Sequence, residues 1–120
     1  MLPQRYRLRR TRDFARARRL GRSAGTSLLA LYVLRTRSPD LRIGFSVSKR
    51  VGKSVVRNRV KRRLREAVRP YVPELRPGQD LVFIARPSAA DASLGQLAES
   101  TAYLLRKTGA VAQKPEARNA

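Results

Sequence analysis

The sequence predicts an α+β fold, in which helices pack on one β-sheet. The chain has 120 residues, of which 42% are hydrophobic, and this suits one domain with a modest core. Apolar or alternating runs at residues 27–35, 41–48 and 80–86 are typical of strands. Residues 54–69 instead repeat Val or Leu at every fourth position, as an amphipathic helix does.

The first third of the chain predicts a helix and two strands. Thr11 can cap a helix that runs to about Leu20, and Gly21 stands where a helix end is expected. Residues 27–35 form an apolar run, interpreted as a buried strand, and residues 41–48 form a second strand. We expect these two strands to pair as a β-hairpin, because only a short turn separates them.

The alternation in residues 41–48 gives that strand two different faces. One face is predicted to be core, and it carries Ile43, Phe45 and Val47. The other face could form the floor of an open groove, because its residues are small or polar: Arg42, Gly44, Ser46 and Ser48.

The rest of the chain predicts a helix at 54–70, a strand at 80–86 and a last helix at 94–107. Ser93 and Gln96 have the spacing of a capping box for that last helix. The pattern therefore gives the order α-β-β-α-β-α.

We expect one domain over residues 1–108. Residues 1–10 form a basic arm, predicted to be partly flexible, and residues 109–120 are predicted to be a disordered tail. The arm and the first residues after it carry a cluster of arginines that could become ordered on a partner: Arg5, Arg7, Arg9, Arg10 and Arg12.

The charge of the chain predicts a polyanionic partner. Lys and Arg number 28 against 8 Asp and Glu, which gives a formal net charge of +20. Residues 49–69 alone hold ten of these cations and a single acid, Glu66. The apolar row on the same segment indicates a folded cationic surface rather than a disordered tail.

The residue types also exclude several classes of function. No Cys and no His are present, which excludes disulfides, thiolate zinc sites and histidine acid–base catalysis. The eight acids are scattered, without the spacing of a two-metal site, so we expect no catalytic or metal-binding residue. The longest apolar run, residues 28–34, is far shorter than the roughly 20 residues of a membrane-spanning helix. We therefore expect a cytoplasmic protein that does not associate with membranes.

The stretch SVSKRVGKSVVRNRVKRRLRE, residues 46–66, closely resembles the signature of the bacterial ribonuclease P protein component. The residues that match are Lys49, Lys53, Arg57, Asn58, Arg59, Lys61, Arg62 and Arg65. The flanking matches are Arg7, Leu8, Asp13, Phe14, Tyr32 and Ile84–Pro87. The resemblance covers about residues 5–108, most of the chain.

This resemblance implies a small two-layer α-β sandwich of order αβββαβα. In the family, the basic helix connects a parallel strand pair by a left-handed crossover, although right-handed crossovers are the strong default. The resemblance also implies a short first strand near residues 22–25, where the residue pattern alone predicts a loop.

The resemblance further implies the function of an accessory subunit. Such a protein binds a catalytic RNA and the 5′ leader of precursor tRNA, and assists the endonucleolytic removal of that leader. The catalyst is the RNA with magnesium, which the RNA subunit and the substrate hold. The polypeptide alone is predicted to be inactive, and no obligate protein partner is predicted.

The residues carried over from the family form two groups. Contacts with the RNA subunit are predicted for Lys49, Arg50, Lys53, Arg57, Asn58, Arg59, Lys61, Arg62 and Arg65. Contacts with the leader are predicted for Phe14, Arg18, Tyr32, Arg42 and Ser46. Arg18 occupies a position where the family often has a second aromatic residue. For Phe14 and Tyr32, ordinary core packing is the alternative.

Three other functions remain open from the residues alone. A small structural ribosomal protein would also be basic. A DNA-binding regulator could insert the basic helix into a major groove, but the sequence shows no helix-turn-helix pairing. A nuclease that acts without RNA is disfavoured by the missing acid–base groups.

Overall fold

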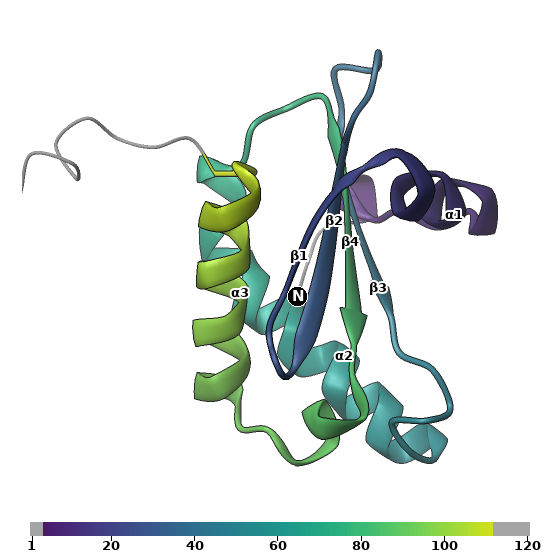
Figure 1. Cartoon of the computed structure of the whole chain (residues 1–120), viewed down its shortest axis with the longest axis vertical. Coiled ribbons are helices and arrows are strands. Elements are labelled where there is room, and N and C mark those ends of the chain that lie inside the picture. Colours follow the sequence, from purple (N-terminus) through teal and green to yellow (C-terminus); the bar gives the residue numbers. More distant parts are fainter. Residues whose placement is uncertain (1–3, 112–120) are drawn as a thin grey trace, which may run out of the picture.

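A computed structural model of the chain describes residues 4–111 (Figure 1). Its helices and strands follow the order αβββαβα that the resemblance implied. They are α1 (Thr11–Leu20), β1 (Arg22–Gly25), β2 (Leu29–Arg35), β3 (Leu41–Ser46), α2 (Ser54–Val68), β4 (Gln79–Ala85) and α3 (Leu94–Thr108). Short 3-10 helices are found at Gln4–Tyr6, Arg69–Glu74 and Pro87–Asp91. No helix among these residues is both long and apolar enough to cross a membrane.

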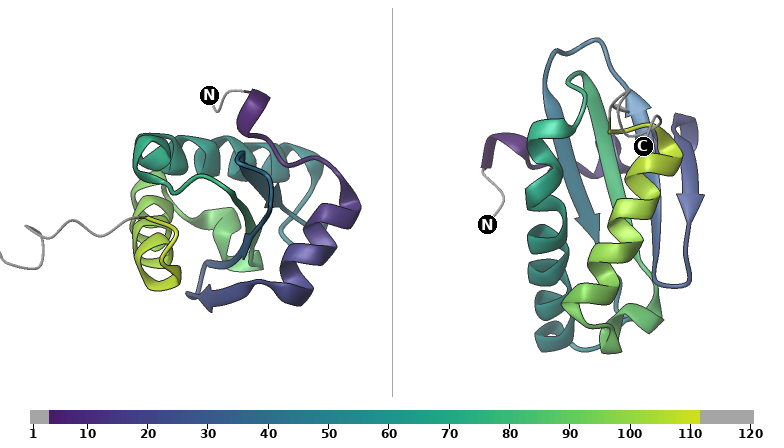
Figure 2. Two further views of the ribbon diagram at one scale, coloured as in Figure 1. Left: turned by 90° about the horizontal axis from the view of Figure 1, so that it is seen from above. Right: turned by 90° about the vertical axis from the view of Figure 1, so that its left-hand side faces the viewer.

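The four strands form one mixed sheet in the order β1-β2-β4-β3. β2 is antiparallel to β1 and to β4, whereas β3 is parallel to β4. The connection from β3 to β4 runs through α2. Viewed from the side of α3, both strands point downwards and β4 lies to the right of β3, so the crossover is left-handed (Figure 2, right).

The predicted hairpin of the second and third strands is wrong, because β4 lies between them. β4 is buried on both faces over most of its length, and so it occupies the centre of the sheet. β3 alternates apolar residues with Arg42, Gly44 and Ser46, and it occupies an edge. The residue pattern did not predict the short strand β1, since its sequence, RSAG, has neither alternating apolar residues nor large side chains.

One face of the sheet packs against α2 and α3, and the hydrophobic core lies between these two layers. From α2, the apolar row contributes the buried side chains of Val60, Leu64 and Val68. From the sheet, the odd-numbered residues of β2, β3 and β4 contribute, including Leu31 and Phe83. The predicted amphipathic character of the basic helix is therefore confirmed.

α1 packs alone on the opposite face (Figure 1). Ala17 is fully buried there against a second, smaller cluster that includes Leu8 and Val82. α1 begins at Thr11, but the N-cap is Arg10 and no side chain caps this helix, so the predicted cap is wrong. Gly21 allows close packing: a Cβ there would lie 2.5 Å from the carbonyl oxygen of Ala17 and 2.8 Å from that of Val33.

The two ends of the described chain are more ordered than the sequence suggested. Leu8 is buried, and its backbone N–H donates to the carbonyl of Ile43, so the basic arm lies along the edge of β3. α3 has the predicted capping box, and Gly109 ends it in the left-handed region at φ 77°. Ala110 is fully buried and accepts a hydrogen bond from the N–H of Arg76, so the predicted disorder is wrong for residues 109–111. The remainder of the predicted tail, and residues 1–3 of the arm, lie outside the described residues.

Candidate nucleic-acid interface

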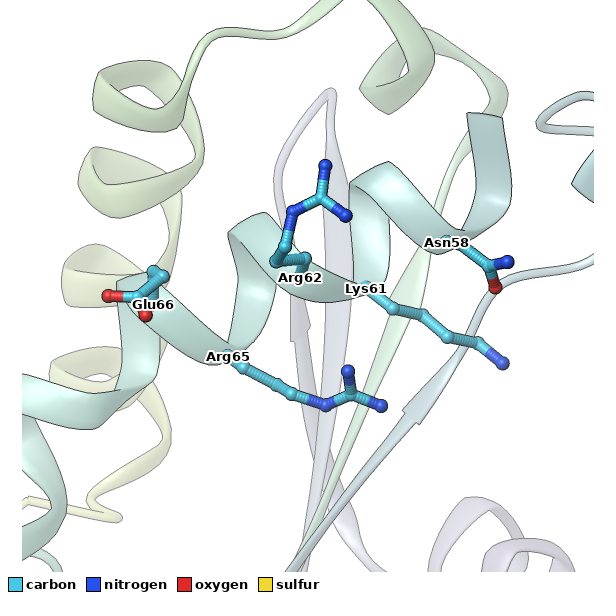
Figure 3. A pocket seen from close by; sticks show the side chains of 5 residues that line it. All are labelled: Asn58, Lys61, Arg62, Arg65 and Glu66. Atoms are coloured by element: carbon cyan, nitrogen blue, oxygen red, sulfur yellow. The ribbon is translucent and has the colours of Figure 1, made fainter. Parts of the chain in front are cut away.

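The exposed side of α2 forms a hollow that we call the basic groove. Its lining residues are Asn58, Lys61, Arg62, Arg65 and Glu66. Lys61 and Arg65 lie one turn apart and extend in the same direction, with Asn58 beside Lys61 (Figure 3). Glu66 points the other way and forms a salt bridge of 3.1 Å with Arg69. The cations of this groove are therefore presented together on one side of the helix, and its acid lies at the margin.

Other cations of α2 bond to backbone carbonyls of the protein itself. Arg57 donates from Nε to the carbonyl of Gly52 at 3.2 Å, and Arg59 donates to that of Ala90 at 3.3 Å. Arg63, which the sequence did not single out, donates to the carbonyl of Ala92 at 2.7 Å. Arg59 also has a buried Nε without a hydrogen-bond partner. These three arginines therefore help to hold α2 on the fold.

The remaining predicted contacts to the RNA subunit lie in the turn before α2. Lys49, Arg50 and Lys53 are all exposed there. Gly52 makes this turn possible: it has φ 152°, and a Cβ would lie 3.0 Å from the side chain of Val56. Gly52 therefore has a backbone role, and the turn extends the cationic surface beyond the helix.

Arg65 lies in a field of like charge. Its pKa is lowered, first by partial burial of the guanidinium and second by the positive charge of Arg7. Both residues line a further hollow, together with Arg9, Phe45 and Lys61. Positive charges from the arm and from α2 therefore gather at this hollow.

On the opposite face of the sheet, the strand register aligns side chains in three rows. The first row is Arg42, Asp80 and Leu34; the second is Gly44, Val82 and Tyr32; the third is Ser46, Ile84 and Ala30. α1 lies across the first two rows. Its Asp13 bonds to Arg42, and its Phe14 ring lies so close to Gly44 that a Cβ there would be 2.4 Å from Cζ.

Beside α1 is a second hollow, which we call the cleft. It is lined by Arg9, Thr11, Phe14, Arg18, Phe45, Ser46 and Lys61, with Ala15 and Val47. Ring faces, hydroxyls and cations therefore meet at this site. Three of the five predicted leader contacts come together here: Phe14, Arg18 and Ser46.

The other two predicted leader contacts lie outside the cleft. Tyr32 is half-buried and lines a neighbouring hollow with Ala15, Arg18 and Arg19, so the side chain of Arg18 separates the two spaces. Arg42 donates from Nε and Nη2 to both carboxylate oxygens of Asp80, each at 2.9 Å. Its guanidinium is thus already occupied within the protein.

Both aromatic rings combine packing with partial exposure. Phe14 and Tyr32 pack against the small cluster around Val82, and neither is fully buried. The core alternative for these rings is therefore partly correct, and it leaves a face of Phe14 on the cleft.

Phe45 is the aromatic cleft residue that sequence reasoning missed. It faces the core as predicted and stacks on Phe83, with ring centroids 5.6 Å apart. However, β3 is an edge strand, so one side of the ring stays half-open and lines the cleft. No local sequence signal predicts this exposure of Phe45, because β3 becomes an edge strand only when β4 inserts between it and β2.

Lys61 lines the basic groove, the cleft and the hollow between them. The two predicted surfaces are consequently continuous, joined where α2 passes the edge of β3. The fold and this site define a class of small basic α+β proteins with a cationic helix on one sheet face and a ring-lined cleft beside the other.

Comparison with known proteins identifies the family. A family model described as Ribonuclease P matches residues 2–109. Proteins named Ribonuclease P protein component are 45% identical over 107 residues in Roseiflexus castenholzii, covering 88% of each chain, and 40% identical over 102 residues in Clostridioides difficile, covering 84% of this chain and 90% of that one. This chain therefore belongs to the family of ribonuclease P protein components, which function in tRNA processing.

Solved structures agree with this assignment. The ribonuclease P protein from Staphylococcus aureus superposes with a TM-score of 0.81 at 29% identity, covering 88% of this chain and 97% of that one. The protein from Thermotoga maritima gives a TM-score of 0.74 at 27% identity, covering 84% and 96%. The family and the fold predicted from the resemblance are confirmed.

Proposed function

We propose that this chain is the accessory subunit of a ribonuclease P whose RNA subunit is the catalyst. The basic groove and the preceding turn bind the catalytic RNA, and the cleft holds the single-stranded 5′ leader of precursor tRNA. The observation that supports this proposal is that Lys61 lines both the basic groove and the cleft, so the two hollows lie side by side.

The basic groove supports the contact with the catalytic RNA. Lys61, Arg62 and Arg65 present their charges from a helix whose other side is locked into the core through Val60 and Leu64. A rigid array of this kind can follow a phosphate backbone without reading base sequence. Since each neutralised phosphate releases counterions, affinity should fall steeply with salt.

The cleft supports the contact with a single strand. Phe14 offers a ring face and Ser46 a hydroxyl, while Arg18 and Lys61 add charge on either side. Stacking on rings is tolerant of sequence, because every base has a π-face. Such a site suits leaders of different sequence, which a tRNA-processing enzyme meets.

The chemistry is assigned to the RNA. Within residues 4–111, no three acidic side chains gather in a group that could hold a metal ion, and the sequence has no His or Cys. The proposal therefore places magnesium on the RNA subunit and the substrate. The polypeptide contributes binding energy and reduces the repulsion between two polyanions.

Its cytoplasmic location stays a prediction.

The test is a cleavage assay with precursor tRNA and magnesium. The chain alone, the RNA subunit alone at low magnesium, and the two together are compared. We expect removal of the leader to be efficient only in the mixture. Cleavage by the purified polypeptide without RNA would refute the assignment of the chemistry.

A second measurement tests the two surfaces. Affinity for precursor tRNA and for leaderless tRNA is determined with the assembled complex and the wild-type chain. The proposed cleft requires tighter binding of the precursor. Equal affinities for the two tRNAs would refute the leader contact while leaving the contact with the catalytic RNA in place.

A further inference from the structure

The first row of the sheet carries an ion-pair network that belongs to neither RNA-facing surface. Arg42 binds Asp80 through two hydrogen bonds of 2.9 Å, and its Nη1 lies 3.4 Å from the Oδ2 of Asp13. The carboxylate of Asp80 is 3% exposed and that of Asp13 is 14% exposed. The pKa of Arg42 is raised, chiefly by the hydrogen bonds that it donates to Asp80. One half-buried cation is thus shared by two carboxylates from different elements.

This network connects α1 to the sheet. Asp80 belongs to β4 and Arg42 to β3, whereas Asp13 lies in the first turn of α1. Asp13 directly precedes Phe14, whose ring lies against Gly44 in the second row and lines the cleft. Any change in the distance between Asp13 and Arg42 would therefore move a wall of the cleft.

We propose that Asp13 and Asp80 are positioning residues that act through Arg42 to hold α1 at the height at which the cleft accepts a single strand. The inference rests on the proposed function and deepens it. In this role Arg42 does not contact the leader; it is the link between the two carboxylates. Two negatively charged residues, Asp13 and Asp80, are then needed for binding of the leader, although the leader itself is an anion.

The inference predicts an effect whose sign is opposite to that of simple electrostatics. Replacing Asp13 by Asn adds one positive unit to the chain, which alone would strengthen binding of any RNA. If Asp13 positions α1, the same change weakens binding of the leader. The two explanations therefore differ in direction, not only in size.

The experiment measures Asp13→Asn in the full chain, assembled with the RNA subunit. We expect affinity for precursor tRNA to fall about fivefold or more, the size typical of a lost coupling between contacting groups. Affinity for leaderless tRNA, and for the RNA subunit itself, should stay within twofold of wild type. Asp91→Asn is the matched control, because Asp91 is exposed and lies beyond the opposite end of β4 from Asp80. It should leave precursor binding unchanged or slightly stronger.

A double-mutant cycle separates positioning from direct contact. Arg42→Gln should lower precursor affinity as Asp13→Asn does, and the double variant should lose no more than the larger single loss. Additive losses, or precursor binding by Asp13→Asn at or above the wild-type level, would overturn the inference. Asp13→Glu, which keeps the charge, should recover part of the affinity.

Controls keep these outcomes interpretable. Thermal unfolding is recorded for each variant, and Asp80→Asn is interpreted only if it folds, since Asp80 itself is buried. If the wild-type complex binds both tRNAs equally, the proposed leader contact and this inference both fail. If the wild type prefers the precursor and Asp13→Asn keeps that preference, only this inference fails.

Discussion

The basic groove and the cleft differ in what holds them in place. The basic groove depends on apolar burial: α2 carries six cations within its fifteen residues, and its position is maintained by Val60, Leu64 and Val68 in the main core. The cleft depends on α1, which a small apolar cluster around Ala17 holds together with the Asp13–Arg42 pair and the approach of Phe14 to Gly44. The main core alone fixes the basic groove, whereas the position of α1 also depends on an ion pair.

This difference indicates a division of labour within one domain. In the proposed function, the surface that follows phosphates needs many charges in a fixed array, and a single helix held in the core supplies them. The surface that binds an unpaired strand needs a cleft of the right width, and that width depends on the distance of α1 from the sheet. Substitutions should therefore affect the two regions separately, except at Lys61, which lines both.

The largest effect is expected from Leu64→Ala. Leu64 is fully buried beneath the basic groove, so its truncation should destabilise the fold by about 2–5 kcal/mol. Denaturant unfolding measures this loss. Val55→Ala is the control on the same helix, because Val55 is 76% exposed and should change stability by less than about 0.5 kcal/mol. Equal losses for the two variants would contradict the hydrophobic anchoring of α2.

Tyr32→Leu tests whether a ring beside the cleft contributes to leader binding. Leucine keeps much of the apolar contact with the small cluster but removes the ring, which should cost about 1–3 kcal/mol of leader binding if a base stacks there. Titration of the complex with precursor and leaderless tRNA measures the difference. Tyr103→Leu on α3 is matched to it, since Tyr103 is 46% exposed and distant in the fold from α1. An unchanged preference for the precursor in Tyr32→Leu would assign Tyr32 to packing alone.

Arg62→Ala should weaken the basic groove without altering the preference for the leader. One lost charge-assisted phosphate contact corresponds to about 1.5 kcal/mol, or roughly tenfold in affinity for the catalytic RNA. The slope of log affinity against log salt should also become shallower by about one. Arg106→Ala removes an equal charge from the exposed side of α3 and should have little effect. Equal losses for both arginines would show that net charge matters rather than the groove.

The smallest effect is expected from Glu66→Gln. Removing the acid at the margin of the basic groove should raise affinity for the catalytic RNA by about 0.5 kcal/mol, since exposed ionic interactions are weak. Filter binding at several salt concentrations can detect a change of about twofold. Glu99→Gln on the exposed side of α3 adds the same charge elsewhere. A gain for Glu99→Gln as large as that for Glu66→Gln would remove any special role of the margin.

Local patterns predicted α2, α3 and three of the strands, because each carries its own periodicity. The apolar row of the basic helix and the capping box of α3 needed no tertiary information. The pairing of the strands did, since the insertion of β4 between β2 and β3 depends on the relative burial of all three. β1 was found only through the family resemblance.

The sequence predicted which residues form the candidate site better than it predicted which side chains contact one another. The spacing of Asn58, Lys61, Arg62 and Arg65 placed them correctly on one surface of α2. Nothing in the sequence pairs Arg42 with Asp80, because they lie 38 residues apart and meet only through the parallel register of β3 and β4. For the same reason, the sequence did not predict that the guanidinium of Arg42 would be paired with carboxylates of the protein itself.

The open edge of β3 has a consequence for the protein when no nucleic acid is bound. Within residues 4–111, the arm pairs with this strand only near Ile43, so the stretch beyond it offers an unpaired edge to a strand from another copy. The Arg and Lys side chains around that stretch repel those of a second copy, and this repulsion opposes strand pairing at low salt. Concentrated salt should therefore promote self-association of the free polypeptide, which light scattering would detect, and an equimolar amount of its RNA partner should suppress it.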